Sequence, residues 1–144
     1  MNSIQKLELE ATELFKQKEY SKVVFEITSQ TKEEQRSTLL CNLLGLSRII
    51  NNKQNKAALI LAIKDFKTGY LKKENTLNSL DSLANFITTN VLLIDLENNH
   101  DFDFSEIINF YEMSEKICQN HRPINLAMAM VFRRLNDAKK LIFH

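Results

Sequence analysis

The amino-acid sequence predicts an all-α domain, and three observations support that prediction. The 144 residues include only 2 Gly and 1 Pro, fewer than the turns of a β-sandwich or barrel need. Apolar side chains recur at three- and four-residue steps along nearly the whole chain, which is the spacing of amphipathic helices. Short polar runs separate these stripes. Because Gly45 and Gly69 stand alone, a Gly-rich phosphate-binding loop is also excluded.

The first half of the chain contains four helical stripes. One covers residues 4–15 and is interrupted at Lys18 and Glu19, and a second begins at Tyr20. A third covers residues 39–50. The polar run at residues 51–56 ends the third helix, because Asn favours turns and caps over helix interiors.

A fourth and a fifth helix follow this polar run. The fourth is expected over residues 57–73. Asn78 and Asp81 form a pair that resembles a capping box, so we expect the fifth helix to begin near Asn78 and to continue to residue 94. Residues 97–101 form the clearest loop in the chain.

Three further helices are expected after that loop. Asp103 and Glu106 have the D-x-x-E form of a capping box and predict that a sixth helix begins at Asp103. Pro123 predicts the first turn of a seventh helix, where its missing N–H is tolerated. Residues 135–137 are expected to turn this helix into an eighth, which ends at His144.

The expected helices form hairpins that share a register. The segment 43–46 resembles the Leu-Gly step of the tetratricopeptide repeat (TPR), in which a small residue lets the two helices of a hairpin approach closely. Gly45 occupies that position here, and Ala11, Ala84 and Ala129 match it elsewhere. The intervals between the four positions are 34, 39 and 45 residues, and the first equals the period of the family.

Helix B of the second hairpin strengthens the resemblance, since Ala62, Phe66 and Gly69 match its Ala-x3-Phe-x2-Ala pattern. The chain also resembles the N-terminal TPR regions of marine low-GC bacterial proteins. The resemblance implies one domain over residues 1–144: antiparallel helical hairpins stacked as a TPR-like α-solenoid of about four pairs, the last incomplete. An irregular α-solenoid or a helical bundle is the alternative. Because a terminal hairpin needs a polar outer face, the unfinished last pair leads us to expect a fragment or N-terminal portion of a longer chain.

The resemblance also implies a binding groove. In TPR arrays the first helix of each hairpin lines a concave surface, and this register places there Glu8, Thr12, Phe15, Asn42, Leu46, Ile49, Asp81, Asn85, Thr88, Leu126, Met130 and Arg133. Carboxamides both donate to and accept from an extended peptide backbone. We therefore expect Asn42, Asn85 and Arg133 to be solvent-accessible. The neighbouring core positions are expected to be buried: Leu44, Leu83 and Phe132.

No residue set in the sequence indicates catalysis or metal binding. His100, His121 and His144 share no metal-ligand spacing with a carboxylate or thiol, and no Ser or Cys is placed to form a hydrolytic triad. Asp101 and Asp103 have the D-x-D form of many glycosyltransferases, but a loop and a helix N-cap account for them better. We expect no enzyme activity, no metal and no cofactor.

The charge balance argues against nucleic acid as a partner. The formal net charge is +1, and nucleic-acid-binding domains are usually strongly basic. A basic cluster around the last turn, Arg133 and Arg134 with Lys139 and Lys140, is interpreted as a solvated surface. The alternative is that this cluster contacts a phosphate or an acidic peptide.

The sequence predicts a cytoplasmic protein without a membrane partner. Cys41 and Cys118 lie 77 residues apart in apolar stripes and are expected to be free, buried thiols. Residues 1–18 contain no continuous apolar region of a signal peptide. The longest apolar candidate, residues 91–96, is interrupted by Asp95.

These observations predict a non-enzymatic TPR-like scaffold. Its expected partner is a protein or peptide segment, or a following domain of the same chain, bound in the concave groove. The alternative is an accessory N-terminal domain of a larger transferase, of the glycosyl- or sulfotransferase type, whose catalytic domain lies beyond residue 144. An α/β domain encoded after residue 144 would favour the transferase.

Overall fold

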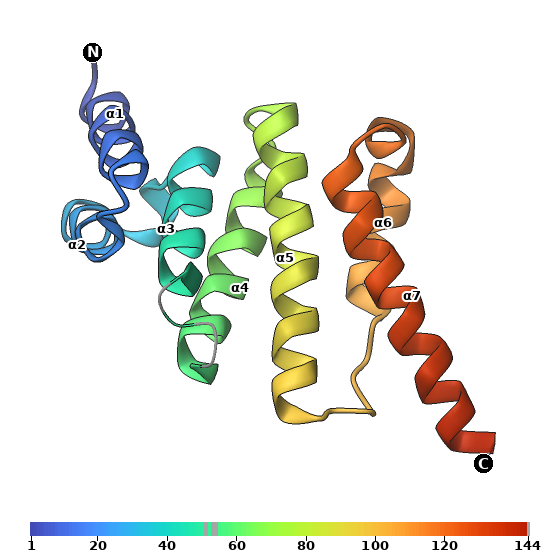
Figure 1. The fold of residues 1–144 in the computed structure, drawn as a ribbon. Helices are drawn as coiled ribbons and strands as arrows, with labels where there is room; N and C mark the ends of the chain where they lie inside the picture. The colour runs from blue at the N-terminus through green and yellow to red at the C-terminus, as the bar shows by residue number, and fades with distance from the viewer. Residues whose placement is uncertain (51, 53–54, 144) are drawn as a thin grey trace.

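The computed structural model describes residues 1–50, 52 and 55–143, with the backbone alone at residue 118 and over 138–143, and every regular element in these ranges is helical. The prediction of an all-α chain is therefore confirmed for the part described. Seven α-helices and one short 3-10 turn (η1) follow one another (Figure 1): α1 (Ser3–Lys16), α2 (Tyr20–Gln30), η1 (Glu33–Gln35), α3 (Thr38–Ile50), α4 (Lys56–Lys72), α5 (Thr76–Glu97), α6 (Ser105–Cys118) and α7 (Arg122–Phe143).

Asparagine side chains cap three of these helices. Asn2 Oδ1 accepts a hydrogen bond from the Gln5 N–H at 2.8 Å, which is half of a capping box at the start of α1. Asn55 caps α4 in the same way. Asn75 Oδ1 accepts from the Asn78 N–H at 3.0 Å, so α5 begins at Thr76. Helix α5 therefore begins two residues before the expected start near Asn78.

The starts of α6 and α7 differ in how well the sequence predicted them. Asp103 Oδ1 accepts from the Ser105 N–H at 2.9 Å, and α6 begins at Ser105, two residues after the expected start. The expected capping box does not form, because the carboxylate of Glu106 instead contacts Lys67 Nζ at 2.8 Å. Pro123 lies in the first turn of α7, as predicted.

The expected turn at residues 135–137 and the eighth helix after it are wrong, because α7 is continuous from Arg122 to Phe143. Ile124, Val131 and the buried residues between them form an apolar stripe that Leu135 continues across the expected turn. Asn and Asp are only modestly unfavourable in a helix interior, by under about 1 kcal/mol each. Packing of the stripe outweighs that penalty.

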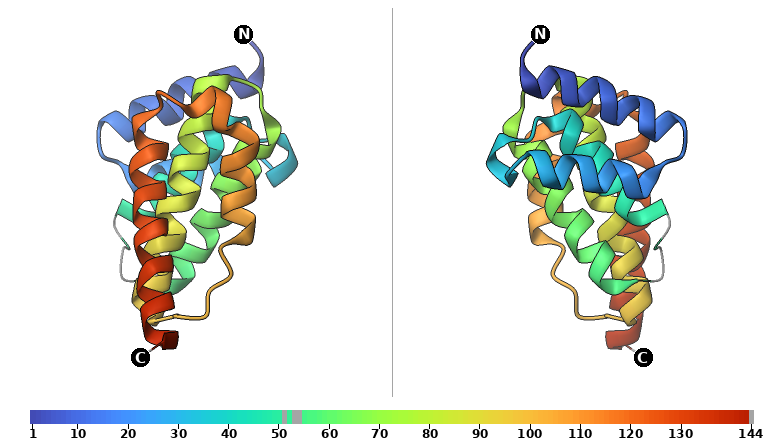
Figure 2. Two further views of the ribbon diagram at one scale, coloured as in Figure 1. Left: turned by 90° about the vertical axis from the view of Figure 1, so that its right-hand side faces the viewer. Right: turned by 90° about the vertical axis from the view of Figure 1, so that its left-hand side faces the viewer.

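Helices that follow one another in the chain pack together, and so do successive odd-numbered helices. Each of α1 to α4 packs against the next helix, and α5 makes a smaller contact with α6. In addition α1 packs against α3, α3 against α5, and α5 against α7. Figure 1 shows the resulting row of helices, and Figure 2 views it from its two ends, with α6 and α7 in front in one view and α1 and α2 in the other.

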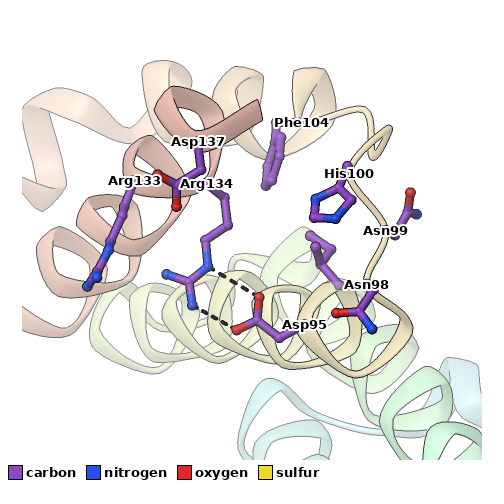
Figure 3. A pocket seen from close by; sticks show the side chains of 9 residues that line it. Asp95, Asn98, Asn99, His100, Phe104, Arg133, Arg134 and Asp137 are labelled. Carbon is purple, nitrogen blue, oxygen red and sulfur yellow. Dashed lines mark hydrogen bonds and ion pairs between the residues drawn. The ribbon is translucent and has the colours of Figure 1, made fainter. Parts of the chain in front are cut away.

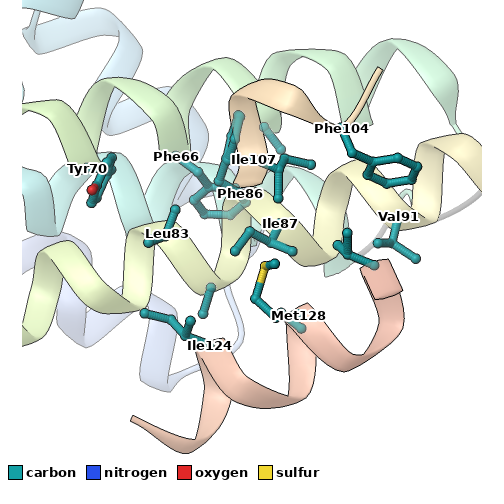
Figure 4. Close-up of a cluster of buried hydrophobic side chains, with 14 of the residues drawn as sticks. Phe66, Tyr70, Leu83, Phe86, Ile87, Val91, Phe104, Ile107, Ile124 and Met128 are labelled. Atoms are coloured by element: carbon teal, nitrogen blue, oxygen red, sulfur yellow. The ribbon is translucent and has the colours of Figure 1, made fainter. Parts of the chain in front are cut away.

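The interior divides into two apolar clusters. The smaller joins α1, α2 and α3 around Leu7, Val23 and Leu44. The larger surrounds α5, whose side chains Leu83 and Ile87 are fully buried. Figure 4 shows this larger cluster, in which α5 lies between residues of α4, α6 and α7. Because α5 is buried on most sides, its few exposed positions define where a ligand could reach it.

Close approach of α3 and α4 depends on glycine. A Cβ at Gly45 would lie 2.5 Å from the ring of Phe66, and a Cβ at Gly69 would lie 2.9 Å from Cys41 Cβ. Gly45 is thus a packing point between the two helices of its hairpin, as expected. The register fails in the last helix, however, where Ala129 is exposed and Ala127 is buried instead.

Candidate functional site

The exposed sides of α1, α3, α5 and α7 form the surface that we call the odd-helix face. It comprises Glu8, Thr12, Leu39, Leu46, Asp81, Asn85, Thr88, Leu92, Leu126 and Arg133, all of them exposed or half-buried. Contacts between successive odd-numbered helices hold these positions in order. The residues predicted for the groove are exposed or half-buried, except Asn42 and Ile49.

At the α1 end, the face contains a hollow of about 410 Å³ between α1 and α3. Glu8, Thr12 and Leu39 line it together with Leu9, which is 60% exposed. Glu8 Oε2 accepts a hydrogen bond from Ser37 Oγ at 3.0 Å, which fixes one wall. The hollow thus offers an apolar contact beside one carboxylate.

Two predicted groove residues are not accessible, because α5 covers the middle of α3. Asn42 is only 7% exposed, and Ile49 is 8% exposed. The Asn42 amide donates to the Asn78 carbonyl at 3.0 Å and accepts from Ser82 Oγ at 2.6 Å. Both ends of its carboxamide are engaged in contacts between helices, so the expectation that Asn42 is solvent-accessible is wrong.

The middle of the face belongs instead to α5. Asp81, Asn85 and Thr88 are half-buried, and they recur at steps of three and four residues with Leu92, which is 38% exposed. Asn85 accordingly lies on the surface, as expected. This stripe combines an amide, a hydroxyl and an apolar side chain.

Asp81 is engaged by a histidine that the sequence analysis did not connect with it. His121 Nε2 lies 3.1 Å from Asp81 Oδ1, and His121 Nδ1 accepts from the Ile124 N–H at 3.3 Å. Since Nδ1 accepts, Nε2 carries the proton and donates to the carboxylate. His121 therefore caps α7 and ties it to α5, and Asp81 has less capacity left for a ligand.

At the α7 end, the exposed residues differ from the prediction. Leu126 and Arg133 are exposed, as a groove position requires, whereas Met130 packs against the larger cluster. Phe132 was expected to be buried and is 48% exposed. The reason is a change of register: Met128 and Val131 take the buried positions of this helix.

A pocket of about 350 Å³ lies between the end of α5, the loop after it and α7 (Figure 3). Arg134 donates through two nitrogens to Asp95, at 2.7 and 3.3 Å, and this contact raises the pKa of Arg134. His100 and Arg133 also line the pocket. The Asp95–Arg134 pair neutralises both charges, and Arg133 and Asp137 add one further charge of each sign to the lining.

The described residues contain no group of three or more His, Cys, Asp and Glu that could hold a metal ion. Burial raises the pKa of the Cys41 thiol to about 12, so this thiol is protonated at neutral pH. None of the described helices has the length and apolar character needed to cross a membrane.

Comparison with known proteins adds no relative: no family model, no curated protein and no solved structure matches the chain.

Proposed function

We propose that this chain is a non-enzymatic scaffold whose TPR-like helical hairpins bind a peptide or protein segment along the odd-helix face. The order of packing supports the proposal, since α1, α3, α5 and α7 contact one another in succession while α2 and α4 each pack between neighbouring odd helices. Stacked hairpins of this kind bury their apolar faces against one another and present an extended surface.

The observation that carries the proposal is the composition of the odd-helix face. Leu92 and Leu126 leave apolar surface accessible on the successive odd-numbered helices α5 and α7. Asn85 and Thr88 place hydrogen-bonding side chains between them. An extended peptide presents apolar side chains and unpaired backbone amides together, so this combination fits it.

A selection from a random-peptide library, displayed on phage, tests the proposal. The affinity of a synthetic copy of a selected peptide is then measured by fluorescence anisotropy. We expect the double variant Asn85→Ala/Thr88→Ala to weaken binding about tenfold, because two hydrogen-bonding side chains are lost. The matched control is Phe25→Ala on α2, a 67% exposed residue away from the face, which should leave the affinity unchanged.

Two results would overturn the proposal. One is a selected peptide that binds the double variant as tightly as the parent protein, or that responds to Phe25→Ala to the same extent. The other is a selection that yields no saturable binder. Circular dichroism of each variant separates loss of binding from loss of fold.

A second candidate partner is another domain of the same polypeptide, such as the catalytic domain of a transferase. The observation that favours it is the exposed apolar surface of α7, where Leu126 is 56% and Phe132 48% exposed. A domain packed there would cover both side chains. The variant Phe132→Glu should then separate the two domains in a longer chain, and it should leave peptide binding at Asn85 unchanged.

A further inference from the structure

The hollow between α1 and α3, at the α1 end of the odd-helix face, has the features of a pocket for one side chain of a bound peptide. It has a volume of about 410 Å³, and we call it the α1–α3 hollow. Its lining consists of Met1, Gln5, Glu8, Leu9, Thr12 and Leu39. Glu8 is the one charged side chain in this lining, so the hollow is acidic.

No basic side chain neutralises Glu8. The odd-helix face contains two carboxylates, Glu8 and Asp81, and Asp81 is engaged by His121 at 3.1 Å. No ion pair between described residues includes Glu8. The cation of this face, Arg133, lies on α7 at the opposite end of the row of helices. Glu8 is therefore the carboxylate of the face whose charge is left for a ligand.

The start of α3 holds the Glu8 carboxylate in place. Glu8 Oε2 accepts a hydrogen bond from Ser37 Oγ at 3.0 Å. Ser37 Oγ in turn accepts from the Leu40 N–H at 3.2 Å, which is the geometry of a helix N-cap. The other oxygen, Glu8 Oε1, has no partner in the part of the chain that the structure describes. One oxygen is thus fixed, and the other is free to accept.

Apolar side chains lie next to this carboxylate. Leu9 is 60% exposed, and Leu39 is half-buried where it packs against the smaller apolar cluster. Thr12 follows Glu8 by one helical turn on the same side of α1, and it adds a half-buried hydroxyl to the lining. A ligand group that fits this lining has an apolar stem and a cationic end, which is the character of a basic side chain.

We propose that the α1–α3 hollow binds a lysine side chain of the peptide that occupies the odd-helix face, an assignment that rests on the function proposed above. The methylene stem packs against Leu9 and Leu39, and the ammonium donates to Glu8 Oε1. An ammonium suits this site better than a guanidinium, because a guanidinium fork pairs best with both oxygens of a carboxylate. Here Ser37 already engages one of the two oxygens.

Parallel selections from the random-peptide library test the assignment. Peptides selected on the parent protein should share a lysine at one position. This enrichment should disappear on Glu8→Gln, which keeps an oxygen for Ser37 and removes the charge. The matched control is Glu10→Gln, which removes a carboxylate of the same helix that does not line the hollow, and it should preserve the enrichment.

A norleucine analogue of a selected peptide then isolates the ammonium, because norleucine keeps the apolar stem and lacks the charge. By fluorescence anisotropy, we expect the analogue to bind the parent protein about fivefold more weakly than the lysine peptide, the upper end of the range for a partly exposed ion pair. On Glu8→Gln, the two peptides should differ by less than about twofold.

Reversal of both charges separates an ion pair from a structural role of Glu8. A peptide in which glutamate replaces the lysine should bind Glu8→Lys more tightly than it binds the parent protein. A merely structural role of Glu8 would make the variant bind every peptide more weakly.

The outcomes distinguish this assignment from peptide binding itself. A selected peptide that depends on Asn85 and Thr88, but binds equally well with norleucine, overturns the lysine assignment and leaves the proposed function intact. Selected peptides with no shared lysine, or with a shared arginine instead, overturn it as well. The absence of any saturable binder overturns both proposals. Because the norleucine comparison uses the parent protein, it holds even where a variant of Glu8 fails to fold.

Discussion

Replacement of Gly45 by Ala tests the contact that sets the distance between α3 and α4. The added Cβ would lie 2.5 and 2.6 Å from two ring carbons of Phe66, where carbon atoms normally stay about 3.5–4.0 Å apart. Phe66 is fully buried, so its ring has no free space to enter. Either the ring or the helix axis must move.

The expected effect is the difference between two opposing contributions. Alanine is favoured over glycine in a helix interior by about 0.8–1.0 kcal/mol. Overpacking of a core costs about 1–3 kcal/mol, and an overlap of about 1 Å with a buried ring belongs in the upper part of that range. Gly45→Ala should therefore lower the free energy of unfolding by about 1–2 kcal/mol. For a domain of this size, the melting temperature should fall by about 3–7 °C.

Urea denaturation and thermal melts followed by circular dichroism measure the effect. The control is the double variant Gly45→Ala/Phe66→Leu, in which a smaller side chain makes room for the new methyl group. We expect the two changes together to destabilise the domain less than the sum of the single changes, by about 1 kcal/mol. A higher melting temperature for Gly45→Ala, or additive effects, would refute the reasoning.

Three further predictions concern other buried positions. Asn42→Ala should lower the free energy of unfolding by about 1–3 kcal/mol, because it leaves the Asn78 carbonyl and the Ser82 hydroxyl without their partner. Asn85→Ala should change it by no more than about 0.5 kcal/mol. Equal urea midpoints for the two variants would contradict this prediction. In a Cys118→Ser background, Cys41 should react with a thiol reagent at neutral pH only as fast as the domain opens, since burial raises its thiol pKa to about 12; rapid labelling of the folded chain would disprove it. Ala84→Leu should overpack the core by about 1–3 kcal/mol, and an unchanged melting temperature would show that its side of α5 is not tightly packed.

Helix positions could be predicted closely, because the periodicity of apolar residues is a local property. The stripe that includes Leu7 and Ala11 predicted α1, and Tyr20 is the first residue of α2. Errors arose where two local signals competed. Asn75 and Asn78 are both good caps, and only the side chain of Asn75 accepts from the first turn of α5.

The candidate site could be predicted less well, because accessibility depends on which helix covers which side. The sequence register correctly placed Asn85 on the surface and Leu83 in the core. It failed for Asn42, which belongs to the same register but lies under α5. Asn42 lies three residues before Gly45 and Asn85 one residue after Ala84, and the register assigned both positions to the groove.

The sequence by itself determined that this chain is helical, where most helices begin, and that glycine is needed at Gly45. Tertiary structure alone decided that α7 continues through residues 135–137, that Asn42 bonds between helices, and that Glu8 of α1 meets Ser37 and Leu39 beside one hollow. The physical reason is the separation along the chain over which each interaction acts. Helix periodicity and capping act over about four residues, whereas burial and electrostatic contacts depend on helices that are distant in the chain.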